Sequence, residues 1–291
     1  MRIALLGLGL IGGSIARALA ERSEDGSNAD GWHVVAWTPD GRAPATALAV
    51  GAIEATAESV GEAVHGADLV VLAAPPLACL DLLEVIASDR SRLRGSALVT
   101  DVASTKGAIV ERAADLGLPF VGGHPMAGVT ERGFGAADGG LFAGHPWVVT
   151  TGPSSPEGGE DRVAALARAS GAVPVAMTAA DHDRIVAGIS HLPLVVAAAI
   201  VETVVDDDWS AAHDLAAGGW ASATRLARGD VAMATGIAVT NREALIARLA
   251  ELEGRLESWR HAIEEADADA LAARFEDARR LLEDEPPRAP S

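Results

Sequence analysis

A glycine-rich turn near the start of the chain constrains the fold more than any other feature. Residues 2–6 are an apolar run typical of a buried strand, and residues 14–21 have a helical composition. Between them stands Gly7-Leu8-Gly9-Leu10-Ile11-Gly12. In this context the first glycine makes the turn, the second admits a pyrophosphate, and the third lets the helix pack on the strand. The pattern predicts a dinucleotide site with its phosphates at the helix N-terminus.

The second apolar run, residues 33–38, is expected to end beside the ribose of the cofactor. An NAD site usually has Asp or Glu at this point, whereas this chain has Thr38, with Asp40 and Arg42 just beyond. Thr38 and Arg42 would suit a 2′-phosphate, while Asp40 would serve NAD if the loop curls back. Both NAD and NADP remain open, and we predict dual or NADP-leaning use.

Further strand candidates alternate with helical segments as far as residue 177. They are residues 69–75, 97–103, 118–121, 147–151 and 173–177. Such alternation predicts an α/β Rossmann-type fold with a doubly wound parallel sheet. Small residues at strand ends would let a cofactor touch the backbone, although the Pro75-Pro76 pair is equally consistent with a plain strand stop. The predicted cofactor contacts are Gly7, Gly9, Leu10, Ile11, Gly12, Thr38, Arg42, Ala74, Pro75 and Ala103.

The character of the chain changes after Met177 to Ala-rich segments of helical periodicity. We therefore expect an α/β domain over residues 1–178, an all-helical domain over 179–285, and a disordered tail over 286–291. Helices this rich in Ala and Leu commonly bury a face against a second subunit, which predicts a homodimer; a monomeric helical cap is the alternative.

Composition excludes several classes of partner. A net charge of −18 argues against nucleic acid and anionic membranes. The longest apolar run, residues 192–201, is about half of the ~20 residues that a bilayer requires. The single cysteine, Cys79, fits a reducing cytoplasm and a place in the core. We expect a cytoplasmic protein without a metal site.

The stretch Gly122-Gly123-His124-Pro125-Met126 follows the apolar run 118–121. If that run is a strand, the glycine pair lets the backbone approach a ligand, and His124 lies at the strand's carboxyl end, where ligands bind in open parallel sheets. An imidazole there can accept a proton near neutral pH. A loop histidine that caps the structure is the alternative reading.

The helical domain also carries polar residues that packing does not require. His182 and His191 are nine residues apart, which places them on opposite faces of an ideal helix unless the chain kinks, and Pro193 could produce such a kink near Ile189. Each is as consistent with a structural histidine as with a ligand. Arg225 is a candidate for a bidentate contact with a carboxylate, and a surface salt bridge is its alternative.

Taken in order, these motifs resemble the prephenate/arogenate dehydrogenase family of tyrosine biosynthesis. The matching stretches are Gly7 to Ser14, Asp101-Val102-Ala103-Ser104-Thr105-Lys106, Gly123-His124-Pro125-Met126-Ala127-Gly128, Leu141-Phe142-Ala143-Gly144 with Trp147, Asp181-His182-Asp183-Arg184, Ile189-Ser190-His191-Leu192-Pro193, and Thr224-Arg225. The resemblance implies a Rossmann domain, a helical dimerisation domain, and an active site between them.

The resemblance also implies roles for individual residues. His124 would accept the proton of the ring hydroxyl, and Ser104 would hydrogen-bond to that hydroxyl and orient His124. Arg225 would bind a substrate carboxylate, with His182 and His191 near the substrate. The reaction would be NAD(P)-dependent oxidative decarboxylation of prephenate to 4-hydroxyphenylpyruvate, or of arogenate to tyrosine. A general base contributes roughly 10²–10⁴-fold to such a rate.

Three positions depart from the family pattern. Leu194 stands where relatives often have a second histidine, and Ser222 and Ala234 stand where they often have Asp and Trp. These departures leave the choice between prephenate and arogenate open. A β-hydroxyacid dehydrogenase would normally use a lysine in the helical domain, but the only lysine of this chain is Lys106. An NAD(P)-sensing binding protein would have no need of Ser104, His124 and Arg225 together.

Overall fold

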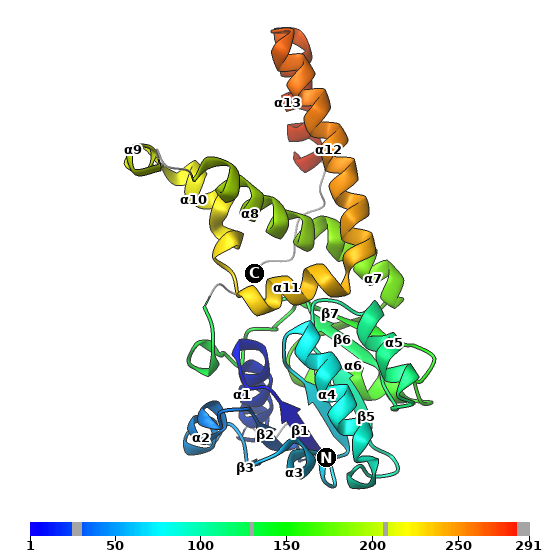
Figure 1. The fold of residues 1–291 in the computed structure, drawn as a ribbon. Coiled ribbons are helices and arrows are strands. Elements are labelled where there is room, and N and C mark those ends of the chain that lie inside the picture. Colours follow the sequence, from blue (N-terminus) through cyan, green and yellow to red (C-terminus); the bar gives the residue numbers. More distant parts are fainter. Residues whose placement is uncertain (25–30, 129–130, 206–208, 284–291) are drawn as a thin grey trace.

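The computed structural model describes residues 1–24, 31–128, 131–205 and 209–283. An α/β part forms one end of the molecule, and a helical part stands on it. Within the helical part, the hairpin of α12 (Arg242–Glu264) and α13 (Ala268–Glu283) projects away from the α/β part (Figure 1). The predicted tail, residues 286–291, lies outside the described residues, as does most of the polar loop before the second strand.

The main sheet has five parallel strands in the order β3-β2-β1-β4-β5. Its strands are β1 (Arg2–Leu6), β2 (His33–Trp37), β3 (Ala55–Thr56), β4 (Leu69–Leu72) and β5 (Leu98–Asp101). All four residues of β4 and all four of β5 are buried, because helices cover both faces of the sheet. The sequence did not reveal β3, which has only two residues.

Helices pack on both faces of this sheet, so the doubly wound fold is confirmed. One core cluster joins strand residues to Ile15 of α1 and Val163 of α6, and the other joins them to Leu83 of α4 and Ile109 of α5. The helices of the α/β part are α1 (Leu10–Glu24), α2 (Arg42–Ala49), α3 (Val60–Val64), α4 (Pro76–Ser88), η1 (Arg90–Arg92), α5 (Gly107–Asp115), η2 (Phe134–Ala136) and α6 (Gly159–Ala169).

The parallel sheet does not continue to residue 177 as expected. Strands β6 (Gly122–Pro125), β7 (Pro146–Thr150) and β8 (Val173–Ala176) form a second sheet, in which β6 and β7 are antiparallel. Between β6 and β7 the described chain holds only the short 3-10 helix η2, so no helical crossover exists to make these strands parallel. Among the described residues, an isolated parallel bridge joins Val99 of β5 to Phe120, which lies two residues before β6, and so links the two sheets.

The helical part begins with a long helix that changes type in its middle. The elements are α7 (Ala179–Val186), the π-helical turn η3 (Ala187–His191), α8 (Leu192–Val204), α9 (Trp209–His213), α10 (Gly218–Thr224), η4 (Arg225–Arg228), α11 (Val231–Thr240), α12 (Arg242–Glu264) and α13 (Ala268–Glu283). Gly218-Gly219-Trp220 forms the first turn of α10, the short helix that precedes Arg225.

The α7–η3–α8 helix spans 26 residues with a mean hydropathy of 2.0, so its length and composition alone would allow it to cross a membrane. Apolar core helices of soluble proteins have the same length and hydropathy. Its first turns pack against the α/β part, since Asp183 of α7 accepts hydrogen bonds from the start of α5. Only 22% of its most apolar window is buried, and much of the remainder is only partly covered in this single chain.

Candidate active site

The glycine-rich turn has the geometry that a dinucleotide requires. Gly7 has a φ of 106°, and a Cβ on it would lie 2.2 Å from the carbonyl oxygen of Ala73, so only glycine fits there. A Cβ on Gly12 would lie 2.3 Å from the carbonyl oxygen of Gly7. A Cβ on Gly9, in contrast, would meet no atom within 4 Å, and α1 begins at the next residue, Leu10. The turn thus presents accessible backbone at a helix N-terminus.

The other predicted cofactor contacts lie at the same edge of the sheet. Thr38 follows β2, Ala74 and Pro75 follow β4, and Ala103 follows β5, and these strands are parallel. Their carboxyl ends therefore meet at the edge that also carries the turn after β1. Fold and glycine geometry fit a bound nicotinamide dinucleotide.

Asp40 is held beside Thr38 at the end of β2. Its Oδ1 accepts hydrogen bonds from the Thr38 hydroxyl at 3.1 Å and from the Arg42 backbone at 3.2 Å. The hydrogen bond from the Arg42 backbone, followed by the one from the Thr38 side chain, lowers the pKa of Asp40 below its usual value. Its carboxylate is therefore ionised at neutral pH. An anion thus stands between the two residues that would receive a 2′-phosphate.

His124 lies inside strand β6, not after a strand over residues 118–121 as predicted. It pairs with Val148 of the antiparallel strand β7. The glycine pair explains the shift: a Cβ on Gly122 would lie 2.3 Å from Thr150 Oγ1, and one on Gly123 would lie 2.7 Å from the Asp101 carbonyl oxygen. Only glycines let this segment pack so closely, and the close packing places His124 beside the carboxyl end of β5.

A buried ion pair fixes the two segments that carry His124 and Ser104. Lys106 and Asp101 are both 0% exposed, and Lys106 Nζ donates to Asp101 Oδ2. The same carboxylate accepts from the backbone of Ala103 at 3.1 Å and of Gly123 at 3.1 Å. Because moving either side chain away would leave the other charge unpaired in the core, the pair holds the β5–α5 loop against β6.

His124 contacts the helical part through a second histidine. Its Nδ1 lies 2.8 Å from Nε2 of His182, which is 1% exposed on α7. Nδ1 of His182 in turn lies 2.8 Å from Oδ1 of Asp183. The Asp183 carboxylate also accepts from the backbone of Lys106 at 2.8 Å and of Gly107 at 2.7 Å. A chain of hydrogen bonds thus crosses from one part of the molecule to the other.

The π-helical turn brings His191 into the same region. An extra residue in a helical turn rotates everything after it, so the opposite-face argument for His182 and His191 fails here. The turn occurs where Pro193 has no backbone N–H to donate to the preceding turn. His191 Nδ1 lies 3.0 Å from the Asn241 amide nitrogen, which also donates to the Asp183 carbonyl at 2.9 Å. His191 Nε2 is buried without a hydrogen bond of good geometry among the described residues, although the Ser104 backbone lies close enough to raise the pKa of His191.

The environment lowers the pKa of two histidines. Burial, followed by the neighbouring His182, Lys106 and His191, lowers the pKa of His124 well below 6.5. Burial also lowers the pKa of His191 to about 4, although the Asp183 charge opposes this shift. Both imidazoles are therefore neutral near pH 7, which a proton acceptor requires. Cys79, whose thiol pKa burial raises to about 12, is an inert core residue.

Ser104 lies in the loop after β5 with a partly exposed side chain. Within the described residues no hydrogen bond joins its hydroxyl to His124, whose ring is oriented by His182 instead. Beside it, Thr105 Oγ1 lies 2.7 Å from Thr240 Oγ1 of α11, so the loop that carries Ser104 contacts the helical part.

Arg225 is exposed at the start of η4, and no ion pair of its side chain occurs within residues 1–24, 31–128, 131–205 and 209–283. Its segment is tied to the α/β part, because Arg132 donates to the Arg228 carbonyl at 2.7 Å and pairs with Asp230 at 3.3 Å. Arg184, another arginine of the helical part, is by contrast paired with Asp181 at 2.9 Å.

Sequence reasoning did not assign roles to Asp183, Asn241 or the Asp101–Lys106 pair. One signal was available for the first: Asp183 is an acidic residue directly beside a histidine, in the polar stretch Asp181–Arg184 that precedes a strongly apolar helix. No local signal connects Asn241 with His191, which are 50 residues apart.

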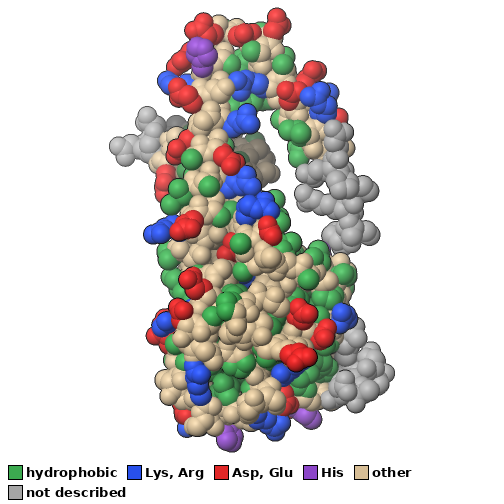
Figure 2. Space-filling model, turned by 90° about the vertical axis from the view of Figure 1, so that its right-hand side faces the viewer, with side chains coloured by type: hydrophobic (Ala, Val, Ile, Leu, Met, Phe, Trp, Pro, Cys, Tyr) green, Lys and Arg blue, Asp and Glu red, His purple; other side chains and the backbone are tan. Residues whose placement is uncertain are grey.

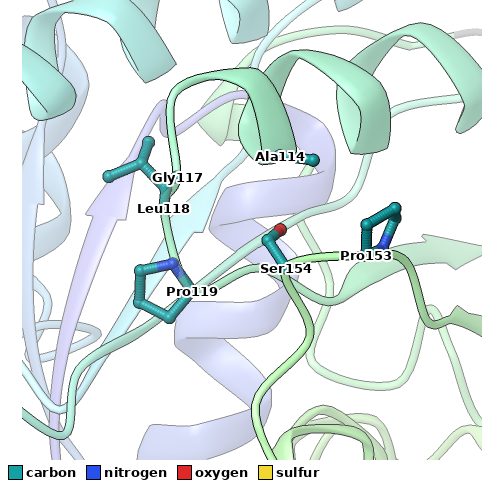
Figure 3. Close-up of a pocket in the computed structure, with 6 residues that line it drawn as sticks. All are labelled: Ala114, Gly117, Leu118, Pro119, Pro153 and Ser154. Carbon is teal, nitrogen blue, oxygen red and sulfur yellow. The ribbon is translucent and has the colours of Figure 1, made fainter.

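Two cavities lie away from His124. One, of about 410 Å³, is at the end of α5 and is lined by Ala114, Gly117, Leu118, Pro119, Pro153 and Ser154 (Figure 3). It contains no titratable side chain, so it offers no acid–base chemistry. The other, of about 500 Å³, lies between α8, α9 and α10 and includes Trp209, Trp220 and Arg228.

The family model described as the nucleotide-binding domain of prephenate dehydrogenase matches residues 30–175, and the model of its dimerization domain matches residues 178–277. The prephenate dehydrogenase of Bacillus subtilis (strain 168) is 33% identical over 95% of this chain and 74% of its own length.

Solved structures agree in fold. The arogenate dehydrogenase of Synechocystis has a TM-score of 0.77 at 29% identity, covering 97% of this chain and 99% of its own. Prephenate dehydrogenase from A. aeolicus, solved with hydroxyphenyl propionate and NAD+, has a TM-score of 0.84 at 24% identity and covers 98% of each chain. From the paired domain models and the nearly full-length similarity, we conclude that the chain belongs to the prephenate dehydrogenase family.

Proposed function

We propose that this protein catalyses the NAD(P)-dependent oxidative decarboxylation of prephenate to 4-hydroxyphenylpyruvate in tyrosine biosynthesis. The observation that carries the proposal is the position of His124. A neutral imidazole, whose Nδ1 is engaged by His182, stands beside the carboxyl end of β5 at the dinucleotide edge. Membership of the prephenate dehydrogenase family supports the same reaction.

In this proposal His124 is the general base. When bound, the nicotinamide accepts the hydride from the ring carbon that bears the hydroxyl. Nε2 of His124 takes the hydroxyl proton, so that the oxygen becomes a carbonyl as the carbon loses its hydride. The ring carboxylate leaves as CO₂, and its electron pair moves through the ring to the carbonyl oxygen, which becomes a phenolate and takes up a proton, so that the ring is aromatic and His124 or water supplies the proton of the product hydroxyl. Ser104 would hydrogen-bond to the same hydroxyl from the β5–α5 loop.

Arg225 is the proposed anchor for a substrate carboxylate. Prephenate brings two carboxylates to a chain of net charge −18, so a local cation must offset an unfavourable field. The exposed guanidinium of Arg225 offers the planar fork that matches a carboxylate. His191 stays in the proposal as a neighbour of the substrate, since its ring is buried beside Asn241 and the backbone of Ser104, the residue proposed to contact the substrate hydroxyl.

Arogenate is the second candidate substrate. The similarity to an arogenate dehydrogenase structure at 29% identity favours keeping it. The two substrates differ in the side chain, where prephenate has a keto group and arogenate an amino group. Leu194, Ser222 and Ala234, which depart from the family pattern, belong to the region that would distinguish them.

A direct assay tests the function, the substrate and the cofactor together. Purified protein is given prephenate or arogenate with NAD or NADP, and the reduced nicotinamide and released CO₂ are both measured. We expect the two products in equal amounts with prephenate, and both at a rate lower by roughly 10²–10⁴-fold with the His124→Asn variant. Cofactor binding without turnover of either substrate would instead support an NAD(P)-sensing protein.

We further propose a homodimer formed by the helical domain, with the chain divided into residues 1–178 and 179–285, in the cytoplasm. Large apolar side chains are exposed on the helical part, among them Ile246, Leu256 and Ile263 of α12 and Phe275 of α13. In Figure 2 the projecting hairpin shows hydrophobic and charged side chains intermixed. Only 22% of the most apolar window of the α7–η3–α8 helix is buried in one chain, and a second copy would cover more.

Light scattering of the purified protein decides the oligomeric state. A dimer of the 29.6 kDa chain is expected across the working range of concentration. A mass that stays at that of one chain would contradict the dimer and favour a monomeric helical cap.

A further inference from the structure

The two nitrogens of each histidine in the His124–His182–Asp183 chain can be assigned from their partners. Asp183 receives the backbone N–H groups of Lys106 and Gly107, so its carboxylate is used throughout as an acceptor. Burial alone would raise the pKa of Asp183, but hydrogen bonds from His182, Gly107 and Lys106 lower it. An ionised carboxylate cannot donate, so Nδ1 of His182 must carry the proton in their 2.8 Å contact.

The assignment passes from His182 to His124. A neutral imidazole with its proton on Nδ1 has a lone pair on Nε2. His182 Nε2 therefore accepts in its 2.8 Å contact with His124 Nδ1, which must donate. His124 then has its own proton on Nδ1, and its Nε2 is left with the lone pair that a general base needs.

We propose that His182 and Asp183 are positioning residues that fix the tautomer of His124 and keep its Nε2 as the proton acceptor. The inference rests on the proposed function of His124. It gives His182 a role other than substrate binding, because both of its ring nitrogens already have protein partners.

The position of Asp183 strengthens this role. Its carboxylate is held by two backbone N–H groups at the start of α5, immediately after the loop that carries Ser104. His182 is 1% exposed and has no room to swing into solvent. The charged or titratable groups that face His124 are His182, Lys106 and His191. A proton that His124 gains from the substrate is stabilised through His182 by the Asp183 carboxylate, as in other acid–histidine pairs.

The sharpest substitution is Asp183→Asn, with Asp181→Asn as its matched control. An asparagine must turn its NH₂ group either toward the Gly107 N–H on the Oδ2 side, or toward the Oδ1 side, where both His182 Nδ1 and the Lys106 N–H lie, so each orientation sets two backbone or side-chain donors against each other. In the second case His182 takes the opposite tautomer, and so does His124, whose Nε2 then carries a proton. Asp181 lies two positions earlier on α7, is exposed, and contacts only Thr178 and Arg184 among described residues.

We expect kcat of Asp183→Asn to fall by about 100-fold or more, with KM for cofactor nearly unchanged, while Asp181→Asn keeps wild-type kcat. A purely structural Asp183 would instead alter KM and thermal stability and leave the tautomer of His124 as it was. His182→Gln serves as a second variant, and it should lower kcat in the same direction.

The decisive readout is nitrogen-15 NMR of the histidine side chains in the full-length, cofactor-free protein. The chain has 8 histidines, and the signal lost in His124→Asn identifies His124. Wild-type protein should show a protonated Nδ1 and an unprotonated Nε2 on His124. A proton on Nε2 of wild-type His124 would overturn the proposal, as would wild-type kcat in Asp183→Asn. Because this spectrum needs no substrate, it remains informative even if neither prephenate nor arogenate is turned over.

Discussion

The dinucleotide edge and the histidine cluster are built in opposite ways, although they lie side by side. The edge is made of backbone and glycines at the ends of parallel strands, and a motif of a few residues marks its turn, although Gly7 itself packs against the Ala73 carbonyl. The cluster is made of side chains from β6, α7, η3 and the start of α12, and its contacts between these elements join residues 50 to 77 positions apart. The binding edge thus carries a local sequence motif, whereas the chemistry depends on how the two parts of the molecule meet.

The largest effect is expected at the point where the two regions meet. His124→Asn should lower kcat by roughly 10²–10⁴-fold, because it removes a general base. Fold and cofactor affinity should remain, since the edge is formed without this side chain. Steady-state kinetics with titration of NAD(P)H fluorescence checks both. A variant with wild-type kcat would show that the cluster is structural.

At the edge itself, Gly7→Ala should destabilise the protein by about 2–4 kcal/mol and abolish cofactor binding, because the new Cβ meets the Ala73 carbonyl and φ is positive. Gly9→Ala is the matched control for folding, since its Cβ would meet nothing within 4 Å. Thermal unfolding compares the two. Equal melting temperatures for both variants would contradict this account of the turn.

Substrate anchoring should give an intermediate effect. Arg225→Ala is expected to raise KM for prephenate by about 10- to 100-fold, the ~1.5–3 kcal/mol of a hydrogen bond to a charged group. Cofactor KM should not change. Arg225→Lys should restore only part of the loss, because it keeps the charge without the second parallel hydrogen bond. If KM is untouched for both prephenate and arogenate, the anchor must be sought elsewhere.

The smallest effect concerns the choice of cofactor. Arg42→Ala should raise KM for NADP severalfold and leave KM for NAD nearly unchanged, since Arg42 is the cation beside the predicted 2′-phosphate position. Asp40, fixed between Thr38 and Arg42, works against a phosphate there. A hundredfold preference of the wild-type protein for NAD would identify Asp40 as the ribose acceptor and refute the predicted use of NADP.

The sequence allowed the local features to be predicted and left the distant ones hidden. Glycine spacing gave the turn after β1, and the apolar runs gave β4 and β5 to within a few residues. His124 could be singled out, but its strand was misplaced, since nothing local says that Gly122 and Gly123 pack against Thr150 and Asp101. Ideal helical periodicity separated His182 from His191, and the stated alternative, a kink near Ile189 caused by Pro193, comes closer to the structure, which has a π-helical turn over Ala187–His191.

The pH dependence of kcat/KM for prephenate, measured side by side for wild type and His124→Asn, tests the central claim most directly. Burial, followed by the neighbouring His182, Lys106 and His191, lowers the pKa of His124, so its neutral form persists as pH falls below 6.5. Wild-type activity should therefore stay level through that range and decline only at lower pH, when His124 becomes protonated. The variant should be slow throughout and lack this decline. A variant that retains the same acid limb at a wild-type rate would contradict the assignment of His124 as the proton acceptor.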